Sequence, residues 1–110
     1  MSRFNGYWVA AIALVCGTIA VSVALYPVMP DRIPVHWNFK GEVDGYGSRA
    51  VGLFLMPAVM AGMLVFFAFL PALSPRNFEV DTFKSSYLFV MLVCTGLFAY
   101  IHAVALYSAW

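Results

Sequence analysis

The 110-residue sequence is 64% hydrophobic and only 10% charged, whereas soluble domains carry about 25% charged residues. So few charges do not cover a water-exposed surface, and the composition excludes an ordinary soluble domain. The formal net charge is +1 and no cluster of basic residues occurs. We therefore expect no nucleic-acid partner.

Charged residues are absent from three long stretches of the chain, residues 4–30, 50–75 and 85–110. Each stretch exceeds the roughly 20 residues that an α-helix needs to cross a membrane. We predict an all-α membrane protein in which residues 1–110 form a single domain. Its transmembrane helices are expected over about residues 7–29, 51–73 and 86–107.

The first stretch has a cleaved signal peptide as its alternative interpretation, because Arg3 precedes the apolar core and Ser22-Val23-Ala24 resembles a cleavage site. However, the apolar core exceeds the roughly 7–15 residues of a signal peptide. A retained helix is therefore favoured.

Small residues spaced four apart recur on all three predicted helices. Such pairs let helix backbones approach closely in a membrane, which favours packing within the chain or self-association. The pairs are Ala13 and Gly17, Ala20 and Ala24, Ala58 and Gly62, and Ala99 and Ala103. Cys16 and Cys94 also fall within predicted helices, and we interpret them as reduced packing residues.

The segment between the first two helices, about residues 30–49, holds most of the charge of the protein. Asp44-Gly45 predicts a turn, and Ser48 is expected to cap the second helix. Pro30 should end the first helix, and Pro34 should hold the preceding residue extended. Gly41 and Gly47 permit backbone angles that are closed to other residues. Three large aromatic residues that seek burial, Trp37, Phe39 and Tyr46, indicate an ordered loop folded against the membrane surface or the helix ends.

Three interpretations of the polar residues in this loop compete. In the first, His36, Asn38, Asp44 and Arg49 only hold the shape of the loop. In the second, the loop recognises a peptide, a lipid or a partner protein. The candidate recognition residues are His36, Trp37, Asn38, Gly41, Asp44, Gly45, Tyr46 and Arg49.

The third interpretation is a metal or catalytic site that includes His102. Histidine inside a membrane helix is uncommon and often functional. With three crossings, the end of the third helix lies on the same side as the first loop, so His102 can approach His36. With Asp44 or Asp31 they would form a ligand set acceptable to zinc. The alternative is a neutral imidazole bonded to a neighbouring helix.

The sequence offers little for catalysis or for transport. It contains no G-x-S-x-G or H-E-x-x-H motif, and the predicted helices contain no carboxylate for a proton or ion pathway. We therefore expect a protein that is not an enzyme and that has no resident cofactor.

The positive-inside rule gives a near tie for the orientation. Arg3, Arg76 and Lys84 lie on one side, and Arg32, Lys40 and Arg49 lie on the other. The N-terminal amine favours a cytoplasmic N-terminus and an outer first loop. The second loop, about residues 74–85, is interpreted as a solvated connector.

Residues 26–49 resemble the N-terminal domain of bacterial SdpI-type membrane proteins. The motifs that carry the resemblance are Tyr26-Pro27, Met29-Pro30, Ile33-Pro34, His36-Trp37-Asn38, Gly41 and Asp44-Gly45-Tyr46-Gly47-Ser48, followed by Pro57 in the next helix. The resemblance implies a multi-pass protein of the bacterial cytoplasmic membrane with an extracytoplasmic first loop. It also implies immunity to a secreted peptide toxin, or signalling of its presence.

SdpI-type proteins usually carry a second three-helix half, with a stretch similar to Asn-Phe-Trp-x-Gly-x-Arg-Thr-Pro-Trp that this sequence lacks. An isolated first domain or a short form is expected. A structural half that packs on a second membrane domain is the remaining alternative for its function.

Overall fold

The structure, a computed structural model, describes residues 3–73 and 84–110. It contains three long α-helices, α1 (Arg3–Leu25), α2 (Arg49–Leu73) and α3 (Lys84–Ala109). All three are long and apolar enough to cross a membrane. By the length and composition of its helices, the prediction of a multi-pass membrane protein with three spanning helices is therefore confirmed.

The helices begin two to four residues earlier than predicted, and α3 also ends two residues later, at Ala109. α1 ends at Leu25 and is followed by a 3-10 turn, η1 (Tyr26–Val28), so the first α-helix does not continue to Met29. Pro27 accounts for the change, because it lacks the N–H that another α-helical turn needs. α3 begins at Lys84 instead of residue 86, and the rest of the predicted second loop, residues 74–83, lies outside the described residues.

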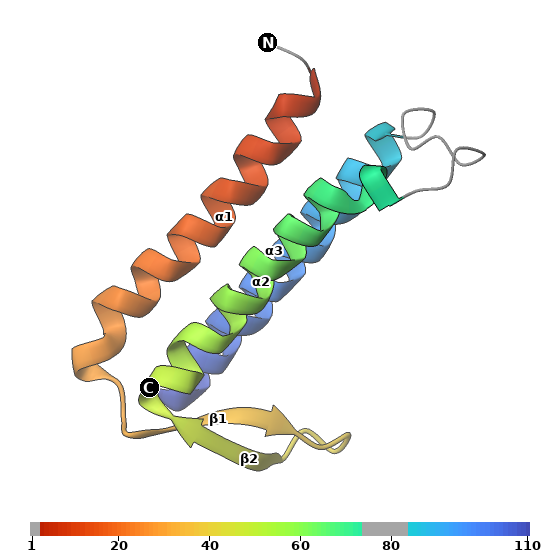
Figure 1. Cartoon of the computed structure of the whole chain (residues 1–110). Helices are drawn as coiled ribbons and strands as arrows, with labels where there is room; N and C mark the ends of the chain where they lie inside the picture. Colours follow the sequence, from red (N-terminus) through yellow and green to blue (C-terminus); the bar gives the residue numbers. More distant parts are fainter. Residues whose placement is uncertain (1–2, 74–83) are drawn as a thin grey trace.

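The helices pack against one another, with α1 in contact with both α2 and α3. Figure 1 shows the N-terminus at one end of the bundle, whereas the C-terminus lies at the opposite end, beside the β-strands. The main buried cluster is apolar and draws on all three helices. Its members are Ala11, Val15, Met60, Leu64, Leu88 and Met91.

The segment between α1 and α2 is ordered, as predicted, but it is a β-hairpin and not an irregular loop. Strands β1 (Arg32–Trp37) and β2 (Val43–Ser48) pair antiparallel. The predicted all-α fold is therefore corrected to three helices with a small two-stranded sheet. The sheet lies across the end of the bundle at which α1 ends and α2 begins (Figure 1).

The turn of the hairpin lies at Asn38–Glu42, and the prediction of a turn at Asp44-Gly45 is wrong because both residues are in β2. The Oδ1 atom of Asn38 accepts hydrogen bonds from the backbone N–H groups of Lys40 (2.9 Å) and Glu42 (3.0 Å). Gly41 has a φ of +82°, a conformation that favours glycine. Gly47 does not need this freedom, because Gly41 alone among the described residues has a positive φ.

The base of the hairpin is anchored to the helix ends by apolar packing. Ile33 is fully buried in a cluster with Met29, Leu53 and Leu106. α2 accommodates Ile33 because Gly52 has no side chain, and a Cβ atom there would lie 2.5 Å from the Ile33 Cβ. The predicted Ser48 cap is confirmed, since its Oγ accepts a hydrogen bond from the N–H of Val51 at 3.2 Å.

Candidate functional site

A cavity of about 300 Å³ lies between β1, α2 and α3, and we call it the hairpin cavity. Its walls are mainly apolar, with Leu55 and Met56 from α2 and Ile101 and Ala105 from α3. The hairpin adds Pro34, Val35, His36 and Trp37. A concave apolar site with a few polar groups is the common form of a ligand-binding site.

Two irregularities in the hairpin position His36. In the register His36 pairs with Gly45, whereas Val35 and Asp44 have no partner across the ladder. Bulges of this kind redirect side chains and are frequent beside functional sites. Here the Nδ1 atom of His36 is hydrogen-bonded to the Asp44 carboxylate. Gly45 admits this arrangement, because a Cβ atom there would approach the His36 Cβ to 3.1 Å.

The other predicted recognition residues hold the shape of the hairpin and do not line its cavity. Asn38 and Gly41 form the turn, as described above. The Arg32 guanidinium lies 4.8 Å from the centre of the Tyr46 ring. Arg49 is paired with Asp31 and lies 5.3 Å from the centre of the Tyr26 ring. Of the predicted set, the structure therefore brings only His36 and Trp37 to the cavity.

The second histidine of the cavity, His102, is buried at 4% exposure and joins the three helices. Its Nε2 atom lies 2.9 Å from the Oγ of Ser22 in α1. The Ser22 hydroxyl donates its proton to the carbonyl oxygen of Leu53 in α2, at 2.6 Å. Since a hydroxyl has one proton to donate, the Nε2 atom of His102 must carry the proton of the second bond.

The role of Ser22 in joining the helices was not predicted from the sequence, where Ser22 was considered only as part of a possible cleavage site. The interpretation of His102 as an imidazole bonded to a neighbouring helix is supported by this contact. The two residues are 80 positions apart, and no local pattern in the sequence indicates their contact.

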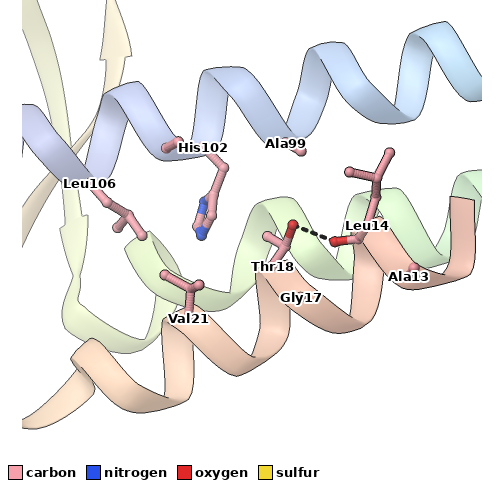
Figure 2. Close-up of a pocket in the computed structure, with 9 residues that line it drawn as sticks. Ala13, Leu14, Gly17, Thr18, Val21, Ala99, His102 and Leu106 are labelled. Atoms are coloured by element: carbon pink, nitrogen blue, oxygen red, sulfur yellow. Dashed lines mark hydrogen bonds between the residues drawn. The ribbon is translucent and has the colours of Figure 1, made fainter. Parts of the chain in front are cut away.

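His102 also borders a second cavity, of about 290 Å³, between α1 and α3. Figure 2 shows the His102 side chain reaching from α3 toward α1, next to Val21 and Thr18. Two of the predicted small-residue pairs, Ala13 and Gly17 with Ala99 and Ala103, line this lateral cavity. Here the small residues leave a space between α1 and α3. The close helix packing that was expected of these pairs is therefore not found at this place.

The predicted zinc ligands are only partly brought together. His36 and His102 border the same cavity, and His36 contacts Asp44. Within residues 3–73 and 84–110, however, no group of three His, Cys, Asp or Glu side chains is placed to hold a metal ion. Cys16 and Cys94 are free thiols, of which Cys16 is exposed and Cys94 is half-buried.

The Ser22–His102 bond should couple α1 to α3 energetically. In a double-mutant cycle of Ser22→Ala and His102→Phe, we expect a coupling energy of about 0.6 kcal/mol, the average for hydrogen bonds between membrane helices. Steric trapping in bicelles measures the free energy of unfolding of each variant. Thr18→Ala is the control, because its hydroxyl donates within α1, to Leu14. If His102→Phe showed the same coupling energy with Thr18→Ala as with Ser22→Ala, the hydrogen bond between Ser22 and His102 would be contradicted.

Comparison with known proteins identifies part of the chain. Residues 13–61 match the family model of a domain of unknown function, DUF1648, which is often found in membrane proteins. No curated protein and no solved structure matches the chain. The matched region contains the whole hairpin, more than half of α1 and the first half of α2. It therefore includes the residues of the hairpin and of α2 that line the hairpin cavity.

Proposed function

We propose that this protein is a non-enzymatic recognition module of the bacterial cytoplasmic membrane. Its hairpin cavity binds an apolar part of a peptide or of a partner protein. The secreted peptide toxins against which SdpI-type proteins act are the first class of ligand to test. In this proposal the N-terminus is cytoplasmic and the hairpin faces outward.

The observation that carries the proposal is the hairpin itself, which is anchored to the helices and covers a formed apolar cavity. A tether between two membrane helices needs neither a buried Ile33 nor a glycine at position 52 to receive it. The cavity has mainly apolar walls, and the polar residues that border it are His36 and His102. These groups suit a ligand that presents an apolar side chain together with a polar backbone or side-chain group.

The location of the cavity supports an amphipathic ligand. It lies beside the ends of α2 and α3 that meet the hairpin, near the boundary of the spanning segments at Arg49 and Ala109. A peptide that acts on membranes collects at this interface with its apolar side chains inserted. Such a ligand reaches the cavity without passing through the bundle.

A variant with alanine at His36, Trp37 and Asp44 tests the proposal. We expect this triple substitution to abolish the protection of a sensitive bacterium from the secreted peptide toxin, because it removes one wall of the cavity and the group that orients it. Growth in the presence of the toxin is the measurement, with membrane insertion checked by fractionation.

The matched control carries alanine at three exposed residues of α1, Ile12, Ile19 and Val23, which face away from the hairpin cavity. This control is expected to protect as well as the unaltered protein. Full protection by the hairpin variant, or no protection by the unaltered protein, would refute the proposal.

A further inference from the structure

The hairpin lies across the end of the bundle and borders the adjoining faces of α2 and α3 (Figure 1). Trp37, the last residue of β1, lines the same cavity as Met56 of α2 and His102 of α3. Met56 is seven residues inside the start of α2 and His102 is seven residues before the end of α3. At 1.5 Å per residue, both lie about 10 Å inside the helix ends.

The ends of the helices, and not this deeper level, correspond to the boundary between lipid headgroups and acyl chains. The spanning segment of α2 contains 22 residues, about 33 Å of helix, compared with a hydrocarbon core of about 30 Å. The helix ends therefore lie close to this boundary, and so does the hairpin that lies across them (Figure 1). Figure 1 shows the turn of the hairpin beyond the edge of the α2 and α3 pair.

The turn that follows Trp37 carries a large apolar side chain with almost no protein contact. Phe39 is 97% exposed, the most exposed of the large apolar residues in the described part of the chain. Lys40 follows it and is also exposed. An isolated two-stranded hairpin is at best marginally stable in water. Ile33 anchors its base and Trp37 borders the cavity, whereas the side chain of Phe39 in the turn has no such protein surroundings.

We propose that the turn of the hairpin is a lipid-binding anchor. Phe39 inserts at the boundary between headgroups and acyl chains, and Lys40 extends its ammonium group to the phosphates. The partner is the phospholipid layer of the leaflet next to the hairpin. The anchor holds the hairpin over its cavity at both ends, through Ile33 in protein and Phe39 in lipid. This inference does not depend on the identity of any peptide ligand.

Tryptophan fluorescence in lipid vesicles tests the anchor. Phe39→Trp preserves an apolar aromatic side chain, and phenylalanine at positions 8, 37 and 110 removes the native tryptophans. The protein is reconstituted without peptide in phosphatidylethanolamine and phosphatidylglycerol vesicles, with and without acyl-brominated lipid. Tyr100→Trp in the same background is the reference, because Tyr100 is exposed on the spanning helix α3.

We expect brominated lipid to quench both variants, and aqueous iodide to leave both largely unquenched. Quenching of the Phe39→Trp variant by iodide but not by brominated lipid would overturn the proposal, since the turn would then lie in water. Resistance to both quenchers would also overturn it, because the turn would then be covered by protein. Neither result would affect the hairpin cavity as a binding site.

Discussion

Replacing Gly52 by alanine is expected to detach the hairpin from the helices. The added Cβ would lie 2.5 Å from Cβ and 2.6 Å from Cγ2 of Ile33. Both atoms belong to the stiff, branched part of a fully buried side chain, so neither moves away easily. Overpacking of this kind typically costs about 1–3 kcal/mol. That energy corresponds to a roughly 5- to 150-fold shift of the equilibrium between the hairpin packed on the helices and the detached hairpin.

Hydrogen exchange of the backbone amides in β1 and β2 measures this shift, because exchange reports local opening. We expect these amides to exchange roughly tenfold faster in the Gly52→Ala variant, with those in the middle of α2 unchanged. Gly62→Ala in the same helix is the matched control, since nothing lies within 4 Å of a Cβ there. Unchanged exchange in the hairpin of the Gly52→Ala variant would show that Ile33 and Gly52 do not hold it.

The sequence was sufficient to predict the three helices, because a membrane span needs only length and the absence of charge. It was also sufficient for the Ser48 cap, which is a local hydrogen bond between residues three apart. The order of the segment between α1 and α2 was also predicted, but the burial on which that prediction rested holds only for Trp37, since Phe39 and Tyr46 are exposed. For the helices and the cap, the physical cause lies within a short stretch of the chain.

The strands were not predicted, because the cause of their formation is not local. β2 has the sequence Val-Asp-Gly-Tyr-Gly-Ser, in which Asp and Gly are poor strand formers. Its pairing depends on contact of Ile33 with Gly52 and on the turn held by Asn38. Asp44-Gly45 has the composition of a turn, but Gly45 instead gives His36 the space to lie close across the strands.

The candidate site was predicted in part. His36 and Trp37 do line the hairpin cavity, and His102 does border it from α3. The apolar walls were not predicted, because residues such as Leu55 and Ala105 are indistinguishable in sequence from others that face lipid. The bond between Ser22 and His102 depends on the relative rotation of two helices, which the apolar pattern leaves undetermined.

Filling the hairpin cavity from its α3 wall is expected to weaken peptide binding without altering the hairpin. Ala105 lies in the cavity wall contributed by α3, and leucine there projects three more carbon atoms into a space of about 300 Å³. We expect the Ala105→Leu variant to bind the secreted peptide toxin at least about tenfold more weakly, since a loss of 1.4 kcal/mol is sufficient for that change. Ala103→Leu is the matched control, because Ala103 borders the lateral cavity instead.

The most direct test of the hairpin cavity as a recognition site is a titration followed by the fluorescence of Trp37, which lies in its wall. Phenylalanine at positions 8 and 110 leaves Trp37 as the sole tryptophan, and the protein is held in lipid nanodiscs while the peptide toxin is added. We predict a saturable change in emission for the otherwise unaltered protein and for Ala103→Leu, and none over the same range for Ala105→Leu. The absence of a saturable change in the unaltered protein, or an equal change in all three, would contradict this assignment of the site.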